Sequence, residues 1–132
     1  MYTIVFYKDE KNRSYVAEYI KELREKKDKN SRINLGKIED IINGLRIHGT
    51  NLGMPYIRRI NSSIWEMRPL RNRILFFCFK DEKIVLLHYF IKKTNKTPRR
   101  EIEKAINEMN NYLRGEIWKR IKILMKGLLG KR

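Results

Sequence analysis

The sequence predicts an α+β fold: an N-terminal strand, a helical hairpin, a four-stranded antiparallel meander and a C-terminal helix. Three observations support this prediction. Residues 64–98 contain three apolar runs separated by two short polar turns, residues 13–48 carry apolar side chains at helical spacing, and helical spacing returns after Pro98. The chain has 132 residues, of which 42% are hydrophobic, enough for one domain with its own core.

The first strand and helix lie near the N-terminus. Residues 2–7, YTIVFY, are β-branched or aromatic, as is typical of a covered strand. From Arg13 to Lys27, apolar residues fall on one helical face, and Ser14 is available near the start. The first strand can pair with any exposed edge of the sheet or insert between strands, because two helices separate it from the others.

A second helix follows a turn at residues 28–30. Asn30 or Ser31 can cap it, and we expect it to end at His48-Gly49 because glycine commonly terminates helices. The short connection predicts an antiparallel helical hairpin packed on the sheet. Residues 50–55 have the composition of a loop.

The meander is predicted from four apolar runs. The expected strands are residues 56–60, 64–70, 73–80 and 83–91, and the last three are joined by turns at Arg71-Asn72 and Asp81-Glu82. Such short links require antiparallel neighbours.

Strand alternation assigns side chains to the two faces of this sheet. It places Arg58 and Arg59 on opposite faces. It places Glu66, Arg68 and Leu70 on one side of their strand, with Trp65 and Met67 on the other. In the last strand it places one set on one face, His88, Phe90 and Lys92. It places the other set on the opposite face, Tyr89, Ile91 and Lys93.

The C-terminal part is expected to form two helices. Thr97 can cap a helix that starts after Pro98 and ends at Arg114-Gly115. We therefore divide the chain into a domain of residues 1–115 and a basic amphipathic extension of residues 116–132. The extension can pack on the domain or on a second copy in a homodimer, bind ribosomal RNA, or lie on an anionic membrane surface.

Positive charge is concentrated in two regions. The chain has 31 Lys and Arg against 15 Asp and Glu, a net charge of +16, and residues 56–100 hold 12 of the cations but only 3 of the anions. A local excess of this kind is typical of a surface that binds a polyanion. No apolar run approaches the roughly 18 residues of a membrane span. We expect a cytoplasmic protein with no membrane span.

Few catalytic motifs are present. The sequence contains no glycine-rich phosphate loop, no Cys or His pairs at metal-ligand spacing, and no Ser/His/Asp set, so we expect no metal and no cofactor. The single cysteine, Cys78, lies in an apolar run and is expected to be a buried thiol. His88 can be either a sheet histidine with satisfied hydrogen bonds or a proton carrier.

Strands that end in Arg and Lys beside aromatic residues can hold phosphates by charge and bases by stacking. For any single cation, a solvated rim is an equally simple interpretation. Three segments sharpen the choice: IWEMRP, RILFF and HYFIKKTNKTPRREIEKA. Together with the order of elements, they resemble the phage-derived, HigB-like branch of the RelE/HigB superfamily of type II toxin–antitoxin toxins.

The resemblance implies a metal-independent endoribonuclease that cuts mRNA, commonly on the ribosome, and is silenced by a cognate antitoxin, expected here to be a helix-turn-helix protein. In such an enzyme a base deprotonates a ribose 2′-OH, which attacks the adjacent phosphorus. The resemblance assigns catalytic roles to Arg68, Lys92, Lys93 and Arg73. RNA-binding candidates are Arg58, Arg59, Arg71, Lys96, Tyr89 and His88; of these, Tyr89 and His88 are candidates for stacking or proton transfer.

Two other classes of function remain open. The same basic sheet can be a binding module for RNA or DNA that lacks catalysis. It can also belong to a structural subunit whose charge complements an acidic partner.

Overall fold

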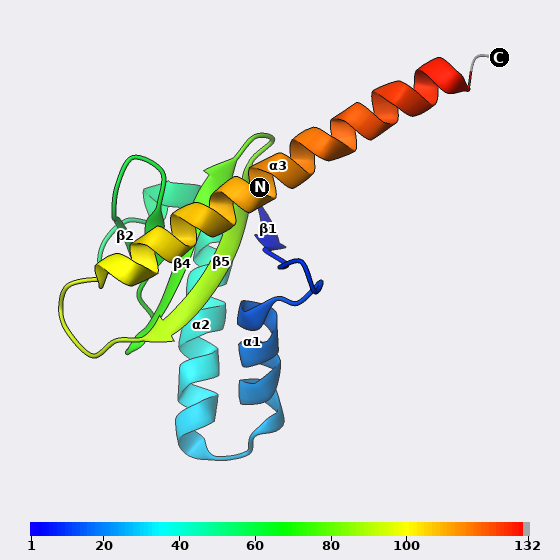
Figure 1. Ribbon diagram of the computed structural model, residues 1–132. Coiled ribbons are helices and arrows are strands. Elements are labelled where there is room, and N and C mark those ends of the chain that lie inside the picture. Colours follow the sequence, from blue (N-terminus) through cyan, green and yellow to red (C-terminus); the bar gives the residue numbers. More distant parts are fainter. Residues whose placement is uncertain (131–132) are drawn as a thin grey trace.

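Five strands form one mixed sheet in the computed structural model, which describes residues 1–130 (Figure 1). They are β1 (Thr3–Phe6), β2 (Ile57–Arg59), β3 (Trp65–Met67), β4 (Asn72–Phe79) and β5 (Lys83–Ile91), in the spatial order β1-β5-β4-β3-β2. The meander from β2 to β5 is antiparallel, as predicted. β1 completes the sheet by pairing in parallel with β5 at its outer edge.

Helices α1 (Tyr15–Glu25) and α2 (Lys29–His48) cover one face of the sheet. Ser14 caps α1, as predicted, by accepting a hydrogen bond from the Ala17 amide. The cap expected at Asn30 or Ser31 is wrong. Asp28 caps α2 instead, because its carboxylate accepts from both the amide and the hydroxyl of Ser31, at 2.9 and 2.8 Å.

The end of α2 at His48 is confirmed, and Gly49 makes it possible. Gly49 has a φ of +56°, and a Cβ there would come within 2.6 Å of the Tyr2 ring. Glycine alone combines this backbone with this close approach. The chain then forms a short 3-10 helix, Gly49–Leu52, where the sequence predicted an irregular loop.

The connection between β3 and β4 is longer than predicted. β3 ends at Met67, and the turn occupies residues 68–71, so a turn at Arg71-Asn72 is wrong. Asn72 begins β4 because its buried side chain accepts from the Tyr19 hydroxyl at 2.6 Å and donates to Asn34 Oδ1 at 2.8 Å. The turn at Asp81-Glu82 is confirmed, both residues having a left-handed φ.

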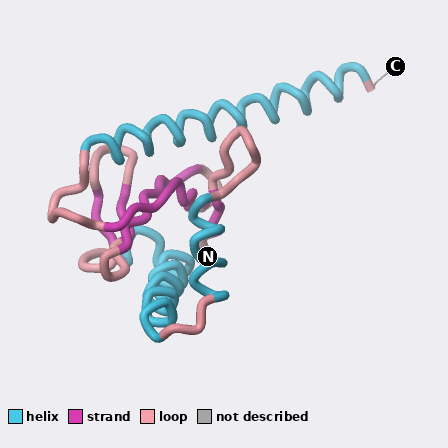
Figure 2. The backbone as a smooth tube through the Cα atoms, turned by 60° about the horizontal axis from the view of Figure 1, so that its bottom comes forward, coloured by secondary structure: helices cyan, strands magenta, loops and turns pink. Residues whose placement is uncertain are grey.

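A single long helix, α3 (Arg99–Leu129), covers the other face of the sheet. Ala105 is fully buried there, among side chains that include Leu75, Phe77 and Leu87. The predicted end at Arg114-Gly115 is wrong. One interior glycine costs a helix only about 1 kcal/mol, and α3 continues beyond the sheet as a projecting arm (Figures 1 and 2).

Cys78 is an exposed residue, so the expectation of a buried thiol is wrong. It lies one residue before the end of β4 and lines a hollow with Trp65, Phe79 and Met109. Partial desolvation there raises the pKa of the Cys78 thiol, which keeps it protonated and weakly nucleophilic at neutral pH. Within residues 1–130, no helix is long and apolar enough to cross a membrane.

Candidate functional site

Three arginines, one each from β2 and β4 and one from just beyond β3, meet around one buried carboxylate on the face of the sheet that α3 covers. We call Arg58, Arg68, Arg73 and Glu66 the arginine cluster. The Glu66 side chain is 1% exposed, whereas the arginine side chains are 36%, 21% and 7% exposed in the order given. The cluster therefore carries its negative charge on a buried floor and its positive charge on an accessible rim, with a net charge of +2.

Strand pairing explains how the cluster forms. In the β2–β3 hairpin Arg58 lies directly opposite Glu66, and in the next strand Leu75 is the partner of Glu66, two positions from Arg73. Residues two apart share a face of a strand, so Arg73 points to the same side as Glu66. Arg68, two positions after Glu66, reaches that side from just beyond the end of β3.

All three guanidinium groups lie close to the same oxygen of Glu66. Oε1 lies 3.3 Å from Arg58 Nη2, 3.7 Å from Arg68 Nε and 3.9 Å from Arg73 Nε. The first is a hydrogen bond, and the other two are charge contacts beyond hydrogen-bond length. Glu66 and Arg68, predicted to lie on one side of their strand, do meet there, and Arg68 shares this carboxylate with two other arginines.

Thr97 occupies the second oxygen of Glu66. Its hydroxyl donates to Oε2 and accepts from Arg58 Nη2 at 3.1 Å. The cap predicted at Thr97 is wrong, because Pro98 holds the N-cap position of α3 and Thr97 makes no capping bond. The hydroxyl instead ties the loop before α3 to the arginine cluster.

Arg73 is the most enclosed member of the cluster. Its Nη1 donates to the carbonyls of Leu70 and Asn72, both at 2.8 Å. The Leu70 carbonyl is turned toward it by a left-handed backbone with a φ of 59°. Burial lowers the pKa of the Arg73 guanidinium, and the neighbouring Arg68 and Arg58 lower it further, although an arginine stays charged at neutral pH.

Two donors in the cluster have no hydrogen-bond partner. Among the described residues, the buried side-chain nitrogens without one are Nε of Arg58 and Nε of Arg68. Buried donors are normally paired, and an unpaired one costs about 1–3 kcal/mol.

The three predicted lysines lie in the segment that links β5 to α3. Lys93 and Lys96 are exposed and Lys92 is half-buried. Lys93 lines a small hollow with Phe90, and Phe90 is the cross-strand partner of Arg73. Alternation predicted that Lys93 faces away from Phe90. β5 ends at Ile91, so Lys93 lies beyond the strand to which that alternation applies.

Two predicted RNA-binding arginines lie outside the cluster. Arg59 points to the opposite face, where its guanidinium lies 5.7 Å from the ring centre of Trp65 and donates to two loop carbonyls. Arg71 is in the turn and donates to the Lys92 carbonyl at 2.9 Å. Leu70, expected on the Glu66 side, also leaves it and lines a pocket beside α2.

The aromatic candidates are engaged in packing. Tyr89 lies on the α1 side, stacked on Tyr19 with ring centres 4.1 Å apart. Burial raises the pKa of Tyr89, which makes it a poorer base at neutral pH.

His88 is 2% exposed and lies between two carboxylates of α3, with Nδ1 2.5 Å from Glu108 Oε1 and Nε2 3.1 Å from Glu101 Oε1. This geometry favours the interpretation of His88 as a sheet histidine. A β-bulge opposite Leu75 turns both Leu87 and His88 toward α3.

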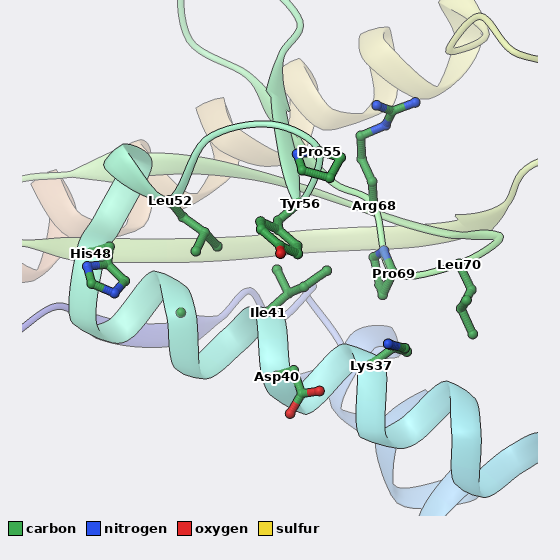
Figure 3. A pocket seen from close by; sticks show the side chains of 11 residues that line it. Lys37, Asp40, Ile41, His48, Leu52, Pro55, Tyr56, Arg68, Pro69 and Leu70 are labelled. Carbon is green, nitrogen blue, oxygen red and sulfur yellow. The ribbon is translucent and has the colours of Figure 1, made fainter.

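A pocket of about 600 Å³ adjoins Arg68 on the α2 side (Figure 3). Tyr56, Leu52 and Ile41 form its interior, and Lys37 and Asp40 lie along α2. Figure 3 shows the Arg68 side chain extending away from α2, so its guanidinium serves the arginine cluster and not this pocket.

The arrangement suits a phosphate group. Three guanidiniums converge from neighbouring strands, two of them partly exposed, and loop lysines follow the adjacent strand. Arginine matches phosphate geometry with paired N–H donors. Among residues 1–130, no group of three or more His, Cys, Asp or Glu side chains is placed to hold a metal ion.

Sequence comparison identifies the family. In a comparison with curated protein sequences, no significant match is found. The family model for the phage-derived Gp49-like proteins (DUF891) matches residues 28–110, a range that runs from the cap of α2 through the arginine cluster and into α3. This chain therefore belongs to the phage-derived Gp49-like (DUF891) family.

Proposed function

We propose that the protein is a HigB-like toxin that cleaves mRNA without a metal ion, with the arginine cluster holding the scissile phosphate. The observation that carries the proposal is the convergence of Arg58, Arg68 and Arg73 on one buried carboxylate. Family membership and the resemblance of WEMRP and KKTNKTP to HigB-like toxins support it.

In the proposed reaction, the ribose 2′-OH loses its proton and attacks the adjacent phosphorus. The P–O5′ bond breaks and the leaving 5′ oxygen takes up a proton, which gives a 2′,3′-cyclic phosphate and a 5′-OH. Negative charge grows on the phosphate oxygens in the transition state, where fixed cations stabilise it most. Arg68 supplies this charge directly, and the enclosed Arg73 adds to the positive potential.

Glu66 positions the arginines in this scheme. A buried carboxylate that faces three guanidiniums fixes where each lies before RNA arrives. Such preorganisation removes the cost of ordering long side chains during the reaction. Lys93 is our candidate for proton transfer, because it is exposed and lines a hollow with Phe90, the cross-strand partner of Arg73. Lys92 and Lys96 extend the positive surface along the RNA.

Arg58 and Arg59 provide a matched test because they are neighbours on one strand with side chains on opposite faces. Expression of the wild type in a bacterium should arrest growth and produce cleaved transcripts. Arg58→Ala and Arg68→Ala should each restore growth, whereas Arg59→Ala should remain toxic. Growth arrest with intact transcripts would reject the nuclease and favour a non-catalytic RNA- or DNA-binding module. Equal effects of Arg58→Ala and Arg59→Ala would reject the placement of the site.

The proposal includes a cognate antitoxin, expected to be a helix-turn-helix protein, as well as mRNA on the ribosome. Co-expression with the product of the adjacent gene should relieve the arrest. Failure to relieve it, or to co-purify, would reject that partner without affecting the cleavage assay.

A further inference from the structure

The projecting part of α3 carries an exposed apolar surface that the sheet does not use. We call Ile117, Trp118, Ile121, Leu124, Met125, Leu128 and Leu129 the C-terminal stripe. Every member is at least 38% exposed, and Leu124 and Leu128 reach 68% and 74%. Seven large apolar side chains on one helix cost free energy in water unless another surface covers them.

The C-terminal stripe is centred on a different side of α3 from the face that packs on the sheet. At 100° per residue, its members span an arc of about 140°. The buried and half-buried residues of the seated part, among them Ala105, Met109 and Leu113, centre about 130° away from it. The two faces meet at one edge, where Leu124 lies in line with Ile106, but most of the stripe faces away from the sheet, which points to a surface outside this domain.

We propose that the C-terminal stripe docks an acidic amphipathic helix of a partner protein. Ile117, Ile121, Leu124 and Leu128 repeat at spacings of four, three and four residues, the seam that a partner helix fills. Trp118 and Met125 widen the seam on one side, as in helices that face a bundle. This inference is independent of the proposed cleavage activity.

Charge selects the partner. Residues 116–130 carry Lys119, Arg120, Lys122 and Lys126 against the single acid Glu116. Arg120 and Lys122 adjoin the two borders of the stripe on the helical projection, where they meet the flanks of a docked helix. A second copy would bring equal positive charges together in a chain of net charge +16, whereas an acidic helix would neutralise them.

A lipid surface fits less well because α3 is one continuous helix. The side of the helix that bears the stripe carries Asn107, Asn110 and Arg114 in the preceding turns. A flat bilayer that buried the stripe would also desolvate these polar groups, at a cost in free energy. A partner helix needs only the surface of residues 117–129.

The test uses two adjacent exposed residues that lie 100° apart on the helix, one inside the stripe and one outside it. Leu124 belongs to the stripe and is 68% exposed, and Ile123 lies on the polar side and is 70% exposed. The probe is a synthetic helix with Leu at its seam and Glu at its flanks, titrated calorimetrically into the full chain. A second peptide carries Lys in place of Glu.

The wild type should bind the acidic peptide, and the Lys peptide should bind at least about tenfold more weakly. Leu124→Ser should weaken binding about tenfold and Ile123→Ser should leave it unchanged, with both variants retaining the wild-type melting temperature. If Leu124→Ser and Ile123→Ser change the affinity for the acidic peptide equally, the proposal is overturned. It is also overturned by binding to phosphatidylglycerol vesicles without binding to the peptide, or by a stripe-dependent dimer in sedimentation.

Discussion

Thr97 and Glu66 are 31 positions apart, yet the Thr97 hydroxyl donates a hydrogen bond to the buried Glu66 carboxylate. The bond joins the loop before α3 to the floor of the arginine cluster. Thr97→Val keeps the shape of the side chain and removes the donor. It should lower the free energy of unfolding by about 1–3 kcal/mol, because a buried carboxylate loses a hydrogen bond. Urea denaturation measures this effect.

Thr94→Val is the control for Thr97→Val. Thr94 is exposed and its hydroxyl donates only to the Lys96 carbonyl, at 2.9 Å. Its replacement should change stability by no more than about 0.5 kcal/mol. If both variants lower the free energy of unfolding by the same amount, the buried bond to Glu66 contributes no more to stability than an exposed one.

The Glu66 carboxylate should be needed to keep three arginines together. Glu66→Gln preserves size but leaves the guanidiniums without their counter-charge. We expect the free energy of unfolding to fall by about 2–4 kcal/mol. This is less than the usual cost of breaking a buried pair, because Arg58 and Arg68 are partly exposed. Added salt should recover part of the loss by screening the repulsion.

The exposed pair of Arg99 and Glu103 on α3 provides the comparison. Glu103→Gln should change stability by less than about 0.5 kcal/mol at any salt concentration. A Glu66→Gln variant as stable as the wild type at low salt would show that the cluster needs no central carboxylate.

His88 should hold α3 on the sheet. His88→Gln leaves the partly buried carboxylates of Glu101 and Glu108 without the ring that faces both. We expect a loss of about 1–3 kcal/mol and faster amide exchange in residues 99–113, measured by hydrogen–deuterium exchange. Exchange in α1 serves as the internal reference. An unchanged α3 would mean that apolar packing around Ala105 is sufficient.

Alkaline pH should weaken the packing between α1 and β5. Burial first, and then the neighbouring Tyr89, raises the pKa of Tyr19 above its usual value of about 10. The folded chain thus holds this proton more tightly than the unfolded chain. The stabilisation is complete below about pH 10 and is lost as pH rises through the folded pKa.

Tyr19→Phe tests this link. At about pH 8 the variant should be less stable by about 1 kcal/mol, because the bond to Asn72 is lost. Between about pH 8 and pH 11 its stability should fall less than that of the wild type. Parallel pH dependences would contradict the assignment to Tyr19.

Much of the fold is predictable because the periodicities are strong. The meander and the hairpin helices follow from alternation and helical spacing, and Asp81-Glu82 adopts the expected hairpin turn. The parallel pairing of β1 with β5 is not predictable from local pattern, because it depends on which edge the helical hairpin leaves free. The helix end expected at Gly115 is absent. A single glycine does not end a helix when the residues before and after it favour helix formation.

The site was predictable only in part. Arg68 and Arg73 were expected from the family resemblance, and their meeting at Glu66 depends on strand pairing. A hairpin centred on Ser62 places Arg58 opposite Glu66, so the register of β2 and β3 was the signal for the third arginine. The bond from Thr97 and the positions of Glu101 and Glu108 beside His88 are contacts between distant segments, which no local pattern encodes.

The chemical groups at the cleaved RNA ends report how the phosphodiester bond is broken. Purified protein is incubated with translating ribosomes and end-labelled mRNA in the magnesium buffer that ribosomes require, and products are analysed by their termini. Attack by the 2′-OH should give 2′,3′-cyclic phosphate and 5′-OH ends, lost with Arg68→Ala and kept with Arg59→Ala. Products with 5′-phosphate ends, cleavage that follows added magnesium in a ribosome-free assay, or no cleavage at all would contradict this mechanism.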